Sequence, residues 1–146
     1  MGQIDSHGFW HPEREIEVIV GDLIGHVGIQ SNGYEGIHGG FGFSLRNSEG
    51  EKILEFCDAL GLVVGNTVFR REEKRLVTYE SGGTKSMLDY ILLRKADRRR
   101  MVRNIKVIPG EECVTQHHLV VGDFVMRKMQ KKGKQLHVVR LWVWKL

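Results

Sequence analysis

Short apolar runs recur along the chain, and glycine or other turn residues bound most of them. Runs of this kind, rich in β-branched residues, predict β-strands. The predicted strands cover residues 16–20, 62–69, 76–79, 86–93, 106–108 and 118–124. Each is short, which is typical of strands that pack in a layered domain.

One segment has helical spacing instead. Ser48 and Glu51 form a capping-box pattern, and Gly61 is a typical C-terminal stop. Between them the apolar positions fall on one face at Ile53, Leu54, Cys57 and Leu60. The pattern predicts a helix from Ser48 to Gly61, and residues 96–104 suggest a short basic helix or turn. Helices interspersed among strands favour an α/β layered fold over an all-β barrel.

Three other segments lack this patterning. Residues 1–15 are predicted to form an irregular leader, and residues 126–146 a basic tail or connector. Residues 25–42 form a glycine-rich loop that is either structured for function or floppy. The remaining patterned region lies within residues 16–125, and a chain of 146 residues allows one domain with a substantial core.

Composition narrows the class of protein further. Hydrophobic residues make up 41% and charged residues 27%, which excludes a collagen-like or wholly disordered chain. Cys57 and Cys113 cannot form a disulfide framework and lack the spacing of a zinc site. No apolar run is long enough to span a membrane, and the N-terminus has no apolar signal core. These features predict a soluble intracellular protein with no membrane partner.

Charge is distributed unevenly between the two halves of the chain. Residues 1–69 contain three basic and ten acidic residues, whereas residues 70–146 contain nineteen basic and eight acidic residues. The asymmetry favours a polyanionic partner such as nucleic acid. A solvated helix face followed by a basic tail explains the charge pattern equally well. The candidate phosphate-contacting residues are Arg98, Arg99, Arg100, Arg103, Lys131 and Lys132.

Three candidate catalytic or metal-binding residues lie within predicted strands, at their ends or next to turns. Asp22 follows an apolar strand directly, Asp89 interrupts the apolar run of residues 86–93, and His117 opens a third strand. A carboxylate in an apolar strand must be paired, metal-bound or facing water. Two carboxylates with a histidine can activate water or hold a divalent metal. Each residue taken singly is also typical of a turn or structural position.

The order of these motifs adds a resemblance to a known family. GDLIGHVG, LGLVVGNTVF, RLVTYESGGTKSMLDYILL and VTQHHLVVGDF follow one another within residues 16–125. They resemble the second half of the exonuclease–endonuclease–phosphatase superfamily. The resemblance is closer still to LINE-type retrotransposon endonucleases and to the craniofacial development protein 2-like family. It implies an α+β four-layer sandwich and Mg²⁺-dependent hydrolysis of DNA phosphodiesters.

The resemblance assigns roles to individual residues. Asp22 matches the phosphate-side aspartate, Asp89 the aspartate that orients the catalytic histidine, and His117 that histidine. Ile24 stands at the family's asparagine position, and Gln116 stands where the family has a carboxylate. Isoleucine offers no hydrogen bond, and a neutral amide is a poorer ligand for Mg²⁺ than a carboxylate. The implied endonuclease is therefore expected to be weakly active or inactive.

The resemblance covers only part of the family domain, since no counterpart of its first half precedes residue 16. We therefore expect a truncated remnant whose exposed sheet face could drive self-association. Two alternatives to an enzyme remain open, a non-catalytic nucleic-acid-binding module and a protein-interaction module. Ancestry and basicity favour a nuclear location.

Overall fold

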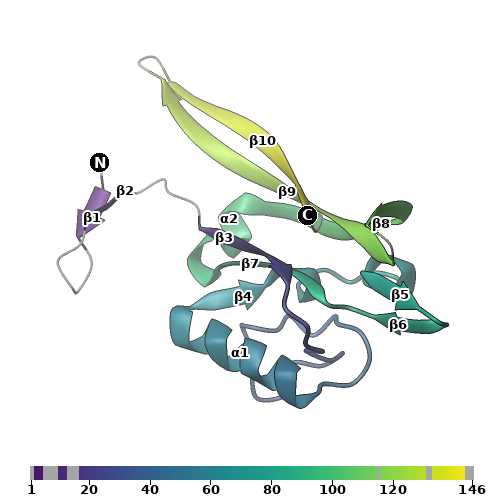
Figure 1. Ribbon diagram of the computed structural model, residues 1–146. Coiled ribbons are helices and arrows are strands. Elements are labelled where there is room, and N and C mark those ends of the chain that lie inside the picture. The colour runs from purple at the N-terminus through teal and green to yellow at the C-terminus, as the bar shows by residue number, and fades with distance from the viewer. Residues whose placement is uncertain (1, 5–9, 13–16, 115, 131–132, 144–146) are drawn as a thin grey trace.

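The computed structural model describes residues 2–4, 10–12, 17–114, 116–130 and 133–143. Its main body is an α+β sandwich with a helix, a central sheet and a second sheet (Figure 1). In Figure 1 the helix α1 (Ser48–Leu60) lies below the central sheet, and the long strands of the second sheet lie above it. No helix among the described residues is both long and apolar enough to cross a membrane.

The central sheet has three antiparallel strands. Strand β7 (Asp89–Arg94) lies in the middle, with β3 (Val18–Asp22) on one side and β4 (Leu62–Val64) on the other. The first five residues of β7 are buried, which accounts for their nearly continuous apolar character. The central strand therefore anchors the fold and carries a buried carboxylate at its first position.

Alternation along the strands builds one core on each face of the central sheet. Leu62 and Val64 of β4 belong to a hydrophobic cluster that also contains Leu54 of the helix α1. Val63 points to the opposite face, where it packs with Val107 and the other apolar side chains that cover the second sheet. Apolar side chains therefore cover the central sheet on both faces.

The second sheet is built around strand β9 (His117–Gln130). It pairs with β8 (Val102–Val114), with β10 (Gly133–Val143) and, at one position, with β5 (Tyr79–Ser81). Strand β5 also forms a hairpin with β6 (Thr84–Ser86). All these pairs are antiparallel, and within the described part of the chain no ladder joins this sheet to the central one.

Helix α1 has the predicted length, but its N-terminal cap differs by one residue. The side chain of Asn47 accepts a hydrogen bond from the Gly50 amide at 2.8 Å, so Asn47 rather than Ser48 is the N-cap. Glu51 accepts instead from the Tyr34 hydroxyl at 2.7 Å. The predicted capping box is therefore wrong, whereas the predicted stop at Gly61 is confirmed by its left-handed conformation.

The glycine-rich loop is a structured segment. The Arg46 guanidinium donates to the backbone oxygens of Val27, Gln30 and Asn32 at 2.8–3.0 Å. The His38 imidazole lies buried and contacts the Gly28 oxygen at 2.7 Å. Of the two readings of residues 25–42, the structured loop is the one observed.

Several short elements differ from the predicted ones. The predicted strand 62–69 ends at Val64, and a 3-10 turn, η1 (Gly65–Thr67), follows it. Two further 3-10 turns, η2 (Glu73–Arg75) and η3 (Lys95–Asp97), precede β5 and the short helix α2 (Arg98–Met101) respectively.

The two ends of the chain also contain strands. Within the predicted leader, β1 (Gly2–Ile4) pairs with β2 (Trp10–Pro12). Within the predicted tail, β9 continues to Gln130 and pairs with β10. Backbone pairing therefore extends beyond the patterned region, while the division into leader, domain and tail stays a prediction.

Candidate functional site

Two carboxylates lie opposite each other in the central sheet. Asp22, the last residue of β3, is the cross-strand partner of Asp89, the first residue of β7. Directly opposed residues of an antiparallel pair present their side chains on the same face. The two strands thus bring both candidate aspartates to one end of the sheet.

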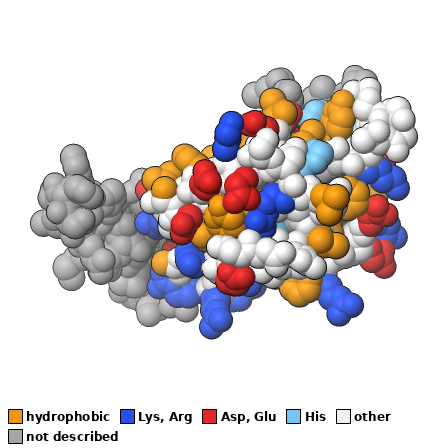
Figure 2. All heavy atoms as spheres, turned by 90° about the horizontal axis from the view of Figure 1, so that it is seen from below, with side chains coloured by type: hydrophobic (Ala, Val, Ile, Leu, Met, Phe, Trp, Pro, Cys, Tyr) orange, Lys and Arg blue, Asp and Glu red, His pale blue; other side chains and the backbone are white. Residues whose placement is uncertain are grey.

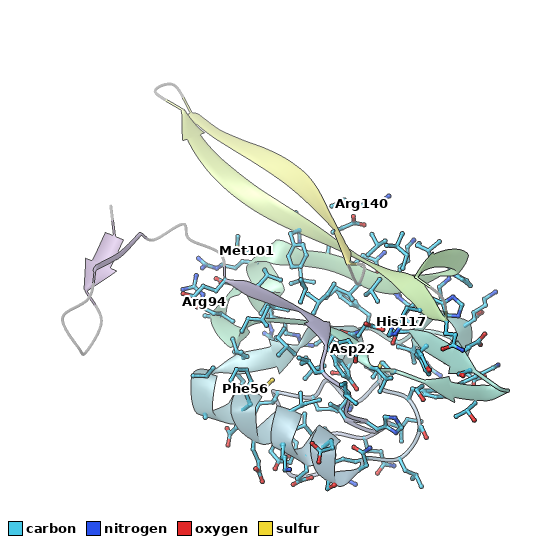
Figure 3. The ribbon with its side chains drawn as sticks, viewed as in Figure 1. Asp22, Phe56, Arg94, Met101, His117 and Arg140 are labelled. Carbon is cyan, nitrogen blue, oxygen red and sulfur yellow. The ribbon has the colours of Figure 1, made fainter. Side chains whose placement is uncertain are left out.

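The second sheet supplies the histidine. The Nδ1 atom of His117 lies 2.9 Å from Asp89 Oδ2, and its Nε2 atom lies 3.9 Å from Asp22 Oδ2. Figure 3 labels Asp22 and His117. Asp89 and His117 are buried, at 5% and 8% exposure, and Asp22 is half-buried. All three candidate residues therefore meet in one cluster, although 95 positions separate the first from the last.

The contact between His117 Nδ1 and the Asp89 carboxylate determines which nitrogen of the imidazole carries the proton. A carboxylate can only accept hydrogen bonds, so Nδ1 carries a proton that it donates to Asp89. In the neutral ring this leaves a lone pair on Nε2, directed to the side where Asp22 lies. A water molecule can bridge a gap of 3.9 Å. The arrangement can take a proton from water.

The same cluster has the donor atoms of a cation site. One ligand atom each from Asp22, Asp89 and His117 lies within 4.8 Å of the others. Carboxylate oxygens are the ligands that Mg²⁺ prefers, and Mg²⁺ usually keeps several waters beside one or two protein carboxylates. The donor set fits such an ion, with the carboxylates as the matching ligands. His117 is then left to contact Asp89 and water.

Three polar side chains that the sequence analysis did not single out lie beside this cluster, and two of them, Asn66 and Thr78, are buried. The Asn66 side chain donates to the backbone oxygen of Asp89 at 2.9 Å and accepts from the Ile91 backbone amide at 2.9 Å. Thr78 accepts from the Asp89 amide, and the Tyr79 ring packs edge-on against His117. The sequence signal that could have identified these residues is their position as polar residues inside or beside apolar runs.

The two positions that depart from the family pattern also lie near the cluster. Ile24 is 70% exposed, and its φ of 51° is a left-handed conformation that a β-branched residue rarely adopts. Gln116 has a φ of 76°, accepts from the Tyr79 hydroxyl at 3.1 Å and donates to the Ser81 hydroxyl at 3.1 Å. Neither side chain adds a carboxylate to the cluster.

The predicted nucleic-acid-binding residues lie elsewhere. Helix α2 follows the far end of β7, where Arg94 pairs with Asp97 at 2.9 Å (Figure 3). The exposed members of the group there are Arg99, Arg100 and Arg103. Five residue steps along β7 separate the two ends by about 17 Å. Arg98 belongs to the same helix, and Lys131 and Lys132 lie outside the described residues.

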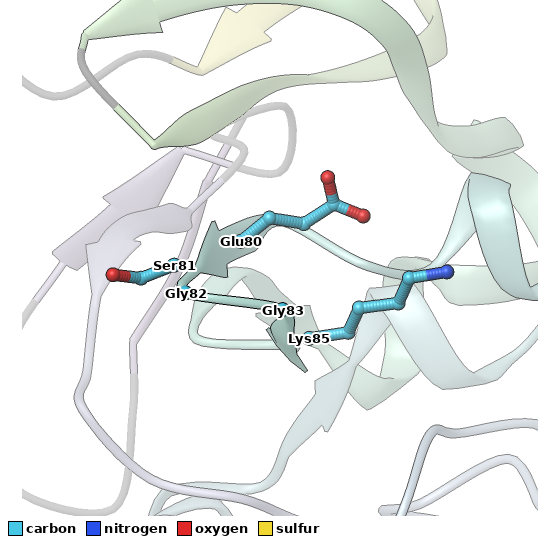
Figure 4. A pocket seen from close by; sticks show the side chains of 5 residues that line it. All are labelled: Glu80, Ser81, Gly82, Gly83 and Lys85. Carbon is cyan, nitrogen blue, oxygen red and sulfur yellow. The ribbon is translucent and has the colours of Figure 1, made fainter.

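Two other surface features are distinct from the cluster. The tip of the β5–β6 hairpin has a small cavity of about 190 Å³, lined by Glu80, Ser81, Gly82, Gly83 and Lys85 (Figure 4). On the face seen from the α1 side, acidic, basic and hydrophobic side chains are interspersed (Figure 2). That face is therefore not a uniformly basic surface.

Comparison with known proteins gives similarity to one of the proteins expected from the motifs. Craniofacial development protein 2 of Bos taurus is 34% identical over 118 residues, covering 80% of this chain and 19% of that protein. The protein of the same name from Tragulus javanicus is 33% identical over 118 residues, covering 80% of this chain and 20% of the relative. No family model and no solved structure matches.

The chain thus spans about a fifth of the length of the curated relatives that it matches. The similarity to craniofacial development protein 2 extends over four-fifths of this chain's own length.

Proposed function

We propose that this chain carries the water-activating part of a divalent-metal-dependent site that hydrolyses DNA phosphodiesters at low turnover. The observation that carries the proposal is the meeting of Asp22, Asp89 and His117 within one cluster. The motif resemblance to exonuclease–endonuclease–phosphatase enzymes of the LINE type supports this chemistry. The similarity to craniofacial development protein 2 agrees with that resemblance.

Each residue has a separate part in the proposed reaction. His117 accepts a proton from water at Nε2, and Asp89 holds the ring through Nδ1 at 2.9 Å. Asp22 orients that water across the 3.9 Å gap and, with Asp89, offers the oxygen ligands for Mg²⁺. A bound Mg²⁺ supplies charge neutralisation at the phosphodiester.

The proposed low turnover follows from two side chains. Phosphoryl transfer depends on positioning and on charge stabilisation more than on covalent chemistry by the protein. Ile24 offers no hydrogen bond to a phosphate, and Gln116 offers no negative charge beside the cluster. The general-base pair is present while two of the groups expected around it are missing.

A plasmid-nicking assay with Mg²⁺ tests the proposal. We expect nicking that EDTA abolishes and that His117→Ala lowers by about 10²–10⁴-fold, the usual contribution of a general base. His118→Ala is the matched control, because His118 faces Glu80 at 3.5 Å instead of the aspartates. We expect an Ile24→Asn/Gln116→Asp variant to nick faster than the wild type. Equal nicking by wild type and His117→Ala would overturn the proposal.

A second candidate function is non-catalytic binding of nucleic acid through α2 and the start of β8. The exposed arginines at the far end of β7 favour it, since they lie away from the aspartates. An Arg99→Ala/Arg103→Ala variant should lower the slope of log affinity against log salt by about 2. Lys52→Ala is the control, because Lys52 pairs with Glu49 on α1. An unchanged slope would contradict this candidate.

A further inference from the structure

The paired residues of the site belong to different sheets. Asp89 opens the middle strand of the central sheet, whereas His117 opens β9 of the second sheet. Among the residues that the structure describes, no backbone ladder connects the two sheets, and apolar side chains pack between them. Apolar contact is non-directional, so it does not by itself set a distance of 2.9 Å between two polar atoms. Directional interactions, such as hydrogen bonds between the two sheets, are needed to set this distance.

Thr78 makes such a link through its side chain and backbone. It is fully buried, and its hydroxyl oxygen accepts from the amides of Leu88 at 2.9 Å and Asp89 at 3.1 Å. Its backbone oxygen accepts from the His118 amide at 2.7 Å. One residue is therefore hydrogen-bonded to the start of both strands that carry the pair.

Tyr79 continues the link to the imidazole itself. It is the cross-strand partner of His117, and the two ring centroids lie 4.9 Å apart at an interplanar angle of 62°. An edge-on contact of this kind restricts rotation of the imidazole about its side-chain bonds. The Tyr79 hydroxyl donates to Gln116 at 3.1 Å, which holds the tyrosine ring in turn.

We propose that Thr78 and Tyr79 are positioning residues that set the Asp89–His117 hydrogen bond across the two sheets. Thr78 fixes the two backbones, and Tyr79 fixes the plane of the imidazole. Asn66 also binds the backbone of β7, but its bonds go to Asp89 and Ile91 of the same strand. The consequence for catalysis rests on the proposed function, whereas the positioning does not.

The first test follows the Nδ1–H proton of His117 by NMR on the folded chain. Thr78→Val keeps the side-chain shape and removes the acceptor, so we expect this resonance to be lost. Thr78→Ser restores the oxygen and should restore the resonance. Thr67→Val is the matched control, because Thr67 is equally buried and its hydroxyl contacts Gly39 and Val64. A resonance that persists in Thr78→Val would overturn the role of Thr78.

The second test separates the ring of Tyr79 from its hydroxyl. Tyr79→Leu should broaden or remove the Nδ1–H resonance, while Tyr79→Phe should keep it because the ring contact remains. Tyr34→Leu is the control, since Tyr34 contacts Glu51 and Arg46 far along the chain from His117. An unaltered resonance in Tyr79→Leu would overturn the role of Tyr79, even where Thr78→Val proves unfolded.

Activity distinguishes this proposal from the proposed function. If Mg²⁺-dependent nicking is measured, Thr78→Val should lower kcat by about 10- to 100-fold, the cost of a small misplacement, with KM little changed. If the wild type shows no nicking but the variants change the resonance as described, positioning stands and the proposed function fails. If nicking occurs and no variant changes the resonance, positioning fails and the proposed function stands.

Discussion

Asp22 and Asp89 are cross-strand partners whose carboxylates share one histidine. Like charges directly opposite each other on a sheet destabilise it. His117 contacts one carboxylate closely and the other at 3.9 Å. The pair is consequently a place where added positive charge should stabilise the folded chain.

We predict that a divalent cation raises the thermal midpoint of unfolding. At ten times its Kd, a ligand of the folded state adds about 1.4 kcal/mol, or about 3–6 °C for a chain of this size. Asp22→Asn should lose most of this increase, measured by calorimetry with Mn²⁺ and with EDTA. Asp58→Asn, on the exposed face of α1, is the control and should keep it. An equal increase in Asp22→Asn would contradict a cation at this pair.

Ile24→Asn should stabilise the protein. A left-handed backbone costs about 1–2 kcal/mol for an ordinary side chain, and asparagine tolerates it better than a β-branched residue. Little burial is lost, because Ile24 is 70% exposed. Chemical denaturation should show a gain of up to about 1 kcal/mol. Ile29→Asn, at an exposed isoleucine without positive φ, should show no gain.

The stability supplied by His38 should fall in mild acid. Burial lowers the pKa of His38, and the nearby Arg46 charge lowers it further. Its Nδ1 accepts from the Gly40 amide at 2.9 Å, which an imidazolium cannot do. Because the folded pKa lies below the unfolded value of about 6.5, this stability is present above that pH and is lost as the pH falls.

Urea unfolding between pH 7 and pH 5 measures this effect. The stability advantage of the wild type over His38→Gln should shrink toward pH 5, with a slope no steeper than about 1.4 kcal/mol per pH unit. His26→Gln is the control and should keep the pH dependence of the wild type. A constant difference between wild type and His38→Gln over this range would contradict the prediction.

Gly50→Ala should destabilise the protein although alanine is the better helix former. A Cβ atom at Gly50 would lie 1.7 Å from the His26 oxygen, so the loop and the first turn of α1 would have to separate. Overpacking of this kind costs about 1–3 kcal/mol. Ala59→Gly, on the exposed part of the same helix, measures the difference in helix propensity between alanine and glycine without overpacking. A gain in Gly50→Ala equal to the loss in Ala59→Gly would show that the close approach is absent.

Local patterns predicted the elements better than their ends. The helix was predictable because its apolar face and Gly61 are encoded in neighbouring residues. Its cap was misplaced because Asn47 and Ser48 are both good N-cap residues, and only the loop contact at His26 selects Asn47. The strand after Leu62 was predicted too long, since Asn66 turns away to bind the backbone of β7.

The sequence predicted which residues form the cluster, but not the strand pairing that brings them together. Asp22, Asp89 and His117 were candidates because of their places in or beside predicted strands and because of the order of the family motifs. The register that opposes the two aspartates depends on which strands become neighbours, and no local period encodes that. Thr78 was missed for the same reason, because its bonds join residues from two sheets.

Asp89 lies at the first position of a buried central strand, so the position of its carboxylate depends on the register of that strand. Sliding β7 by a single position would turn every one of its side chains to the opposite face. Leu92 and Leu93 would then exchange the two hydrophobic clusters in which they are buried, which the packing resists. Sequence drift that preserves this core therefore also preserves the location of the Asp89 carboxylate.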